Sequence, residues 1–330
     1  MTIPRRESIA LFCLGMIAPG AQAQTAAPAY PVKPIRIVVP AAPGGVTDVL
    51  ARALGQRLTE TWGQPAIVEN RAGANNMIAA EHVARAAPDG YTLFVSPETT
   101  FVVNPALYSK LPYDAVRDFA PITGLVRINH GLVTHPSLPV KSVKELISLA
   151  RTKPGEIAYG SFGTGSSGHL NMTVFQRDAG VTFTHVPYKG ATPALADVMA
   201  GHIQAMLISV GSAVPQWKAG KVKLLAVGAA VRMAQLPEVP TIAEGGGLPG
   251  FEALSWFALV TTAGTPRETV ARVNGEVQRA FGDSAFREKF VAPYYFESIT
   301  GSPEALAEHF RSEARKWSKV VQEAKVRLDQ

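Results

Sequence analysis

The residues with the clearest chemical potential are those of the stretch Gly163–Gly168, which reads GTGSSG. This stretch matches the G-x-G-x-x-G pattern of dinucleotide-binding loops, and it lies between an expected strand and an expected helix. Dinucleotide-binding domains also carry an acidic residue about 20 positions later, which binds the ribose hydroxyls. No Asp or Glu occurs between Asp178 and Asp197. The missing acidic residue argues against a nicotinamide or flavin site, and we expect no cofactor.

Other catalytic patterns are incomplete. The spacing around Ser166 does not supply the G-x-S-x-G sequence of a nucleophile elbow. His169 lies one turn into the expected helix, and we expect it to be a packing or polar wall residue. Asp48 has no second carboxylate in its motif, so we expect a capping or supporting group rather than a general base. The sequence also lacks metal-binding patterns such as H-E-x-x-H and D-x-D-x-D-G. It predicts neither an enzyme nor a metal site.

Two segments keep a simpler chemical possibility, the binding of an anion. Both 38–48 (VVPAAPGGVTD) and 159–169 (YGSFGTGSSGH) run from a strand through a glycine loop into a helix. Free backbone N–H groups and the helix dipole can be directed at an anion at such a junction. In open α/β sheets these loops lie at the carboxyl ends of strands, where ligands bind. We expect an anion site between the two segments, although two ordinary tight turns have the same spacing.

The elements that would position these loops alternate between strand and helix. The apolar run 35–40 predicts a buried strand, and a helical pattern begins at Val46. Strands are expected at 65–70 and 91–96, with a helix at 77–87 between them. This order predicts an α/β fold with a mostly parallel sheet and right-handed crossovers.

The same pattern restarts near residue 121, which predicts two similar lobes. It comprises strands, helices and a capping box at Ser142–Glu145, followed by a further strand after Phe251 and two amphipathic helices. The expected strands lie at 131–136, 156–161, 181–188, 203–209 and 222–228, and the two late helices at 266–282 and 302–324.

The N-terminus reads as an export signal. Arg5 and Arg6 precede an apolar stretch at 9–20 and the small residues of 21–23, which predicts a signal peptide over 1–23 and a periplasmic protein. Cys13, the only cysteine, lies inside it, so the mature chain has no thiol for catalysis, metal binding or disulfides. The net charge of +6 is spread along the chain, which does not indicate nucleic-acid binding.

Several stretches together resemble the Bug-type solute-binding receptors of tripartite tricarboxylate transporters. The resemblance begins in 30–74 (YPVKPIRIVVPAAPGGVTD and onward) and continues through AAPDGYTLFVS, YGSFGTGSSGHL, THVPYKGATPALADVMAG and LSWFALVTTAGTPRETVARVN. It covers essentially the whole mature chain in order. It implies a Venus-flytrap fold of the type II periplasmic kind, with residues 24–125 plus 254–330 in lobe 1 and 126–253 in lobe 2. It further implies a monomer that binds a small organic carboxylate for membrane transporter subunits.

The resemblance also implies which residues contact the ligand. Its motifs map onto three loops and one strand end of this sequence: Pro43, Gly44, Gly45, Asp48, Ser96, Ser161, Gly163, Thr164, Gly165, Ser166, Tyr188, Gly190 and Ala191. The sequence departs from the family pattern at Ile208, where many relatives have Asp, at Ala72, where Pro is usual, and at Asn75 and Asn76. These departures concern the identity of the ligand rather than the fold.

Two alternatives stay open at this point. One is an exported α/β oxidoreductase that binds a dinucleotide at Gly163–Gly168. The other is a receptor of the same kind that passes its ligand signal to a sensor rather than to a transporter.

Overall fold

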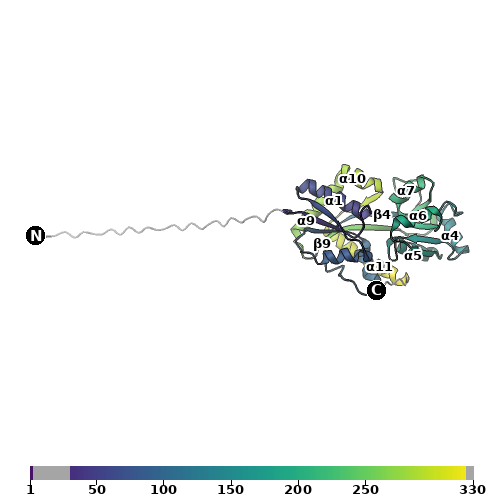
Figure 1. The fold of residues 1–330 in the computed structure, drawn as a ribbon, viewed down its shortest axis with the longest axis horizontal. Helices are drawn as coiled ribbons and strands as arrows, with labels where there is room; N and C mark the ends of the chain where they lie inside the picture. The colour runs from purple at the N-terminus through teal and green to yellow at the C-terminus, as the bar shows by residue number, and fades with distance from the viewer. Residues whose placement is uncertain (3–29, 325–330) are drawn as a thin grey trace.

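The computed structural model describes residues 1–2 and 30–324, so the predicted signal peptide lies almost wholly outside the described residues. The described chain folds into two α/β lobes that share one long strand (Figure 1). We call first lobe the sheet made by β1, β2, β3, β9, β10 and the start of β4, with its helices. The second lobe is the sheet made by β5 to β8 and the end of β4, with its helices.

The first lobe begins with alternating strands and helices. In chain order these are β1 (Ile35–Val39), α1 (Val46–Trp62), β2 (Ala66–Asn70), the short helix η1 (Ala74–Asn76), α2 (Met77–Ala84), β3 (Thr92–Pro97), the π-helix η2 (Thr99–Val103) and α3 (Asn104–Leu107). The chain then enters β4 (Phe119–Thr134).

The second lobe repeats the alternation, and the C-terminal part returns to the first. The elements of the second lobe are α4 (Val143–Thr152), β5 (Ala158–Ser161), α5 (Ser167–Ala179), β6 (Thr184–Pro187), α6 (Ala191–Ala200), β7 (Ala205–Ser209), α7 (Val210–Lys218), β8 (Lys223–Val227) and α8 (Ile242–Gly246). The returning elements are β9 (Leu254–Thr262), α9 (Arg267–Gly282), α10 (Ser284–Phe290), η3 (Ala292–Tyr294), β10 (Phe296–Ser298) and α11 (Pro303–Ala324).

Local sequence explains why α1 forms and where it stops. Leu50, Leu54 and Leu58 recur every fourth residue and are buried, as in an amphipathic helix packed on a sheet. The helix ends at Trp62 and is followed by Gly63, whose φ of 68° is left-handed and whose N–H bonds to the Thr59 carbonyl. Glycine takes this conformation without strain.

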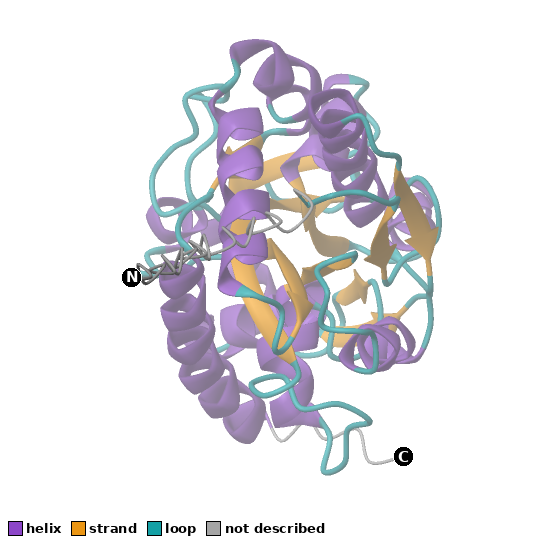
Figure 2. Cartoon of the chain, turned by 90° about the vertical axis from the view of Figure 1, so that its left-hand side faces the viewer, coloured by secondary structure: helices purple, strands orange, loops and turns teal. Residues whose placement is uncertain are grey.

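Each lobe has a core on both faces of its sheet. The first lobe has two clusters of buried hydrophobic residues. Along β1, Ile37 and Val39 belong to one cluster and Val38 belongs to the other, as the alternation of side chains along a strand requires. Along β4, Leu132 and Val133 divide in the same way between the two clusters of the second lobe. Figure 2, in which the first lobe faces the viewer, shows helices on both sides of its strands.

The long strand β4 joins the lobes. Residues 119–129 pair with β9, whereas residues 130–134 pair with β7 and β8. Strand β4 is antiparallel to every strand with which it pairs. The strands β1 to β3 pair in parallel, and so do β5 to β7, as the sequence predicts. The lobe boundaries expected from the sequence stay a prediction.

Sequence patterns predicted only the end of β4, at 131–136. The earlier part contains Pro121 and Gly124, residue types that weaken a local strand pattern. In the structure the register with β9 shifts at both places, and the strand continues because β9 supplies the pairing.

The capping box at Ser142 is half formed. Its hydroxyl accepts the Glu145 N–H, but the Glu145 carboxylate accepts the N–H of Lys141.

Candidate functional site

The sheet topology directs both glycine loops at the junction between the lobes. Strand β4 runs from the first lobe into the second, and β1 and β3 run in the same direction, since β9 is antiparallel to both β3 and β4. Their carboxyl ends therefore point toward the second lobe. Strand β7 is antiparallel to β4, and β5 and β6 are parallel to β7, so their carboxyl ends point back. The loops after β1 and β5 thus face each other, in the position where open sheets bind ligands.

In the first lobe, Asp48 organises the loop between β1 and α1. Its carboxylate accepts hydrogen bonds from the Gly44 N–H at 2.9 Å, Arg52 Nε at 2.8 Å and Asn70 Nδ2 at 2.9 Å. Burial raises the pKa of Asp48, but the hydrogen bonds from Arg52, Gly44 and Asn70 outweigh it and lower the pKa below the ordinary value. Asp48 therefore stays ionised, and its carboxylate is engaged by donors of the protein itself. It acts as a supporting group rather than as a base.

The same loop presents free backbone donors at the start of α1. Pro43 and Gly45 are exposed, and no side chain caps Gly45 at the helix N-terminus. The Val49 N–H bonds to the Gly45 carbonyl at 3.0 Å, whereas the N–H groups of residues 46–48 have no acceptor among the described residues. These N–H groups carry the positive end of the helix dipole.

The loop between β5 and α5 is held from within. The N–H of Gly163 donates to Ser161 Oγ at 3.2 Å, and the N–H of Gly165 donates to His169 Nδ1 at 3.1 Å. Ser166 Oγ donates to the Gly163 carbonyl at 2.7 Å and accepts the His169 N–H at 3.4 Å, which caps α5. Both glycines are left-handed, with φ of 131° and 81°. Their part is to shape the loop.

Other N–H groups at this loop make no bond to the described protein, and two of them, those of Ser167 and Gly168, belong to buried residues, with Gly168 next to the Phe162 ring. Thr164 is exposed, and Ser167 and Gly168 form the first turn of α5. None of these three N–H groups has an acceptor within the described part of the chain. Ser167 and Gly168 are not among the contact residues expected from the sequence, although their position after the cap Ser166 is the signal that identifies them.

The loop between β6 and α6 lies against the glycine loop. The Tyr188 N–H bonds to the Ser161 carbonyl at 3.0 Å, and its hydroxyl donates to Asp197 at 2.6 Å. Burial, together with the hydrogen bond to Asp197, raises the pKa of Tyr188 to about 12. Gly190 has a φ of 127° and precedes Ala191, the first residue of α6. The structure thus brings together the expected residues of these two loops.

Two expected contact residues are fully buried. Ser96, near the end of β3, has its Oγ 2.7 Å from Thr100 Oγ1, and Ser161 has its Oγ 2.7 Å from His185 Nε2. Both hydroxyls are engaged with protein groups. Their observed contacts support the loops from behind.

The residues that depart from the family pattern lie in different surroundings. Ile208 is buried in the core of the second lobe. Asn75 donates to Asn104 Oδ1, and Asn104 donates back to the Asn75 carbonyl, both at 2.8 Å. These bonds hold Ala74, Asn75 and Asn76 in consecutive left-handed conformations, which cost energy for residues other than glycine.

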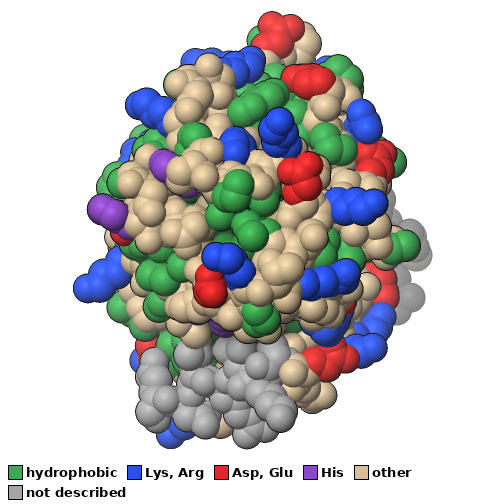
Figure 3. Space-filling view, turned by 90° about the vertical axis from the view of Figure 1, so that its right-hand side faces the viewer, with side chains coloured by type: hydrophobic (Ala, Val, Ile, Leu, Met, Phe, Trp, Pro, Cys, Tyr) green, Lys and Arg blue, Asp and Glu red, His purple; other side chains and the backbone are tan. Residues whose placement is uncertain are grey.

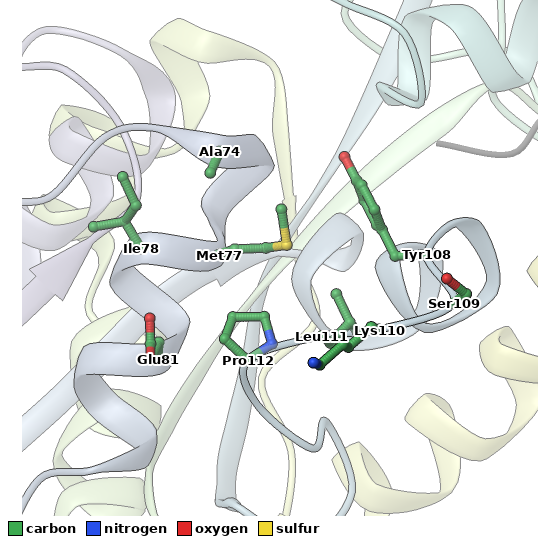
Figure 4. A pocket seen from close by; sticks show the side chains of 9 residues that line it. All are labelled: Ala74, Met77, Ile78, Glu81, Tyr108, Ser109, Lys110, Leu111 and Pro112. Carbon is green, nitrogen blue, oxygen red and sulfur yellow. The ribbon is translucent and has the colours of Figure 1, made fainter. Parts of the chain in front are cut away.

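A pocket of about 440 Å³ lies beside this strained loop (Figure 4). Side chains from α2, including Met77 and Glu81, form one side, and residues 108–112 form the other. None of the contact residues expected from the sequence lines this pocket. It is separate from the two glycine loops.

The surface and composition of the described chain add two facts. Basic, acidic and hydrophobic side chains are interspersed on the outer face of the second lobe (Figure 3). Among the described residues, no helix combines the length and apolar character of a membrane span, and no group of three His, Cys, Asp or Glu is placed to bind a metal ion.

Comparison with known proteins gives one family and a consistent set of structures. Residues 50–326 match the family described as "Tripartite tricarboxylate transporter family receptor". R. palustris Rpa4515 with adipate is 36% identical, with a TM-score of 0.84 over 91% of this chain and 100% of that one. MatC from Rhodopseudomonas palustris with bound malate is 34% identical, with a TM-score of 0.78 over 88% and 100%. The periplasmic binding protein BugD is 31% identical, with a TM-score of 0.80 over 91% and 100%.

Proposed function

The chain belongs to the tripartite tricarboxylate transporter receptor family, and we propose that it captures a small organic carboxylate between its two lobes. Two similar proteins, each covered along its whole length, were solved with adipate and with malate, both of which are dicarboxylates. We also propose that the chain works in the periplasm, as BugD does, and delivers its ligand to membrane transporter subunits. This role requires binding and release but no catalysis.

The observation that carries this proposal is the pair of helix N-termini facing the same junction. The free N–H groups of residues 46–48 at α1 and of Ser167 and Gly168 at α5 come from different lobes. A carboxylate held by both would gain hydrogen bonds and two favourable helix dipoles. Waters can bridge a carboxylate to N–H groups that it does not reach directly.

Ligand binding would favour a closed arrangement of the lobes. A ligand that contacts both lobes binds the closed form more tightly than the open form, and it shifts the equilibrium by that difference in affinity. The lobes are linked through β4 and the start of β9, where a hinge motion would be accommodated. A membrane partner that recognises only the closed form would then select the loaded protein.

A thermal-shift screen tests the proposed function. We expect adipate, malate or a related dicarboxylate to raise the melting temperature, since ligand at 100 times Kd adds about 2.7 kcal/mol of stability. Adipamide, which has the same carbon chain without charges, serves as the matched control and should give no shift. Stabilisation by NAD or FAD, with no shift from any carboxylate, would contradict the proposal and favour the dinucleotide alternative.

A further inference from the structure

We propose that His169 and His185 position the anion-binding loop of the second lobe, with His169 acting as an uncharged hydrogen-bond acceptor for the Gly165 N–H. The inference rests on the proposed function, because it assigns these residues a part in the same site. Neither histidine needs to contact the ligand. They would determine which N–H groups of the loop remain free for it.

The geometry around Gly165 carries the first step. His169 lies in the first turn of α5, and its Nδ1 accepts the buried Gly165 N–H at 3.1 Å. Since Nδ1 accepts, the proton of the neutral ring is on Nε2. The bond removes the Gly165 N–H from the set that a ligand can use. It also fixes the orientation of the peptide group between Thr164 and Gly165, and Thr164 is exposed.

The second histidine supports both the ring and the preceding glycine. The rings of His169 and His185 stack with centroids 4.1 Å apart and an angle of 16° between their planes. His185 Nε2 lies 2.7 Å from Ser161 Oγ, which accepts the Gly163 N–H at 3.2 Å. The two histidines thus hold, directly or through Ser161, both left-handed glycines of the loop.

This arrangement requires His169 to be neutral, and it is disfavoured when both rings carry a proton. A proton on His169 Nδ1 would remove the acceptor, and two protonated rings in stacking contact would repel each other. The titratable groups that face the pair are each other and Tyr159 of β5, whose ring stacks on His185 with centroids 4.9 Å apart. Burial, and then the neighbouring His185, lowers the pKa of His169 to about 4, and burial lowers that of His185. The neutral pair is therefore maintained in a near-neutral periplasm.

Substitutions that keep or remove the acceptor test the proposal. Asn at 169 can place its Oδ1 close to the position of Nδ1, whereas Leu fills similar space without an acceptor. We expect His169→Leu to weaken adipate binding by about tenfold or more, as loss of a buried hydrogen bond implies, and His169→Asn to restore most of the affinity. His135→Leu, which changes a histidine of the same lobe outside the loops, is the control.

A second readout needs no ligand. In the ¹⁵N spectrum of the wild type, the Gly165 amide should titrate with an apparent pKa near that of His169, about 4. This titration should vanish in His169→Asn, and the amide should lose its protection from hydrogen exchange in His169→Leu. If His169→Leu does not fold, Ser161→Ala removes the acceptor of the Gly163 N–H and should weaken binding in the same direction.

The outcomes separate this inference from the proposed function. Wild-type affinity in His169→Leu, or unchanged protection of its Gly165 amide, would overturn the positioning role even if carboxylates bind. A wild-type protein that binds no carboxylate would contradict the proposed function, and the Gly165 resonance would still decide whether His169 holds the loop.

Discussion

Single residues hold the two loops in place, because their polar side chains form hydrogen bonds with other groups of the protein. Asp48 accepts three hydrogen bonds in the first lobe, and in the second lobe Ser161 and Ser166 bond to the backbone of Gly163. Such residues keep the loops ordered before ligand arrives, which lowers the entropy cost of binding. The donors left for a carboxylate are then backbone N–H groups of fixed direction.

Replacing Asp48 should disorder the first loop. We expect Asp48→Ala to lower the free energy of unfolding by about 1–3 kcal/mol, because the Gly44 N–H, Arg52 and Asn70 lose their acceptor. It should also weaken carboxylate binding. Urea unfolding measures the first effect, with Glu60→Ala, an exposed carboxylate on the same helix, as the control.

The pH dependence gives this prediction a sign. The folded-state pKa of Asp48 lies below its ordinary value of 3.8, so the stabilisation is present above that value. It is lost as the pH falls through the lower folded-state pKa. The difference between wild type and Asp48→Ala should therefore shrink only in acid, and a difference that is constant down to acid unfolding would contradict the assignment.

Among the elements, η2 and α11 are joined to β9 by two carboxyl groups, that of the buried Glu98 and that of the partly buried Glu313. Glu98, just before η2, accepts the Trp256 N–H of β9 at 3.0 Å. Glu313 of α11 accepts the indole N–H groups of Trp256 at 3.2 Å and Trp317 at 3.1 Å. Aromatic packing adds to these bonds, with Phe310 stacked on Phe101 at 4.8 Å. The C-terminal helix is thus part of the first lobe rather than an appendage.

Glu98 should make the stability of this assembly depend on pH. Burial raises its pKa to about 8, although the Trp256 N–H acts in the opposite direction. Between the ordinary value of 4.5 and about 8, the folded protein binds more protons at this group than the unfolded chain. Stability is therefore lost as the pH rises through this range. Glu98→Gln keeps an acceptor for the Trp256 N–H but cannot ionise. Between pH 5 and 8 we expect its free energy of unfolding to rise relative to that of the wild type by as much as roughly 3 kcal/mol.

Denaturant unfolding at several pH values measures this gain. Glu288→Gln, at an exposed position of α10, is the matched control and should follow the wild type. A Glu98→Gln variant whose stability parallels the wild type from pH 5 to 8 would show that Glu98 is ionised in the folded protein.

In the whole molecule, the lobes meet at a ring of three backbone hydrogen bonds. The His130 N–H bonds to the Ala253 carbonyl at 2.9 Å, the Gly228 N–H to the His130 carbonyl at 2.7 Å, and the Ala253 N–H to the Gly228 carbonyl at 2.9 Å. The ring lies where β4 changes its partner strands. Farther out, the Asn171 side chain of α5 donates to the Leu254 carbonyl at 2.9 Å.

The close approach at Gly228 should matter for lobe closure. A Cβ atom at Gly228 would lie 2.3 Å from the Ala253 carbonyl oxygen, so Gly228→Ala must push the strands apart. We expect a loss of about 1–3 kcal/mol of stability and weaker ligand binding, although no loop residue changes. Gly282→Ala, where a Cβ meets nothing within 4 Å, is the control. Ligand-induced compaction, measured by small-angle X-ray scattering, should be smaller in Gly228→Ala. Unchanged compaction and affinity would remove the junction from the closure mechanism.

Sequence alone determined the family, the order of most strands and helices, and the two glycine loops. These features depend on local chemistry: the alternation of apolar residues, the capping Ser166, and glycines at the strand-to-helix turns. The match over residues 50–326 confirms the resemblance, and the similar solved structures confirm the two-lobed α/β fold. The contact residues stay a prediction.

Which groups of the loops are free, and where the loops face, depends on tertiary contacts. The Gly165 N–H is occupied because His169 folds back on it, and Ser161 is buried because β6 places His185 beside it. The direction of both loops follows from the antiparallel pairs of β4, whose partners are distant in sequence. Pairings between residues far apart in the chain leave no local pattern, so they appear only once the strands are paired. The bond between Gly165 and His169, which are four residues apart, depends on the conformation that the folded loop adopts.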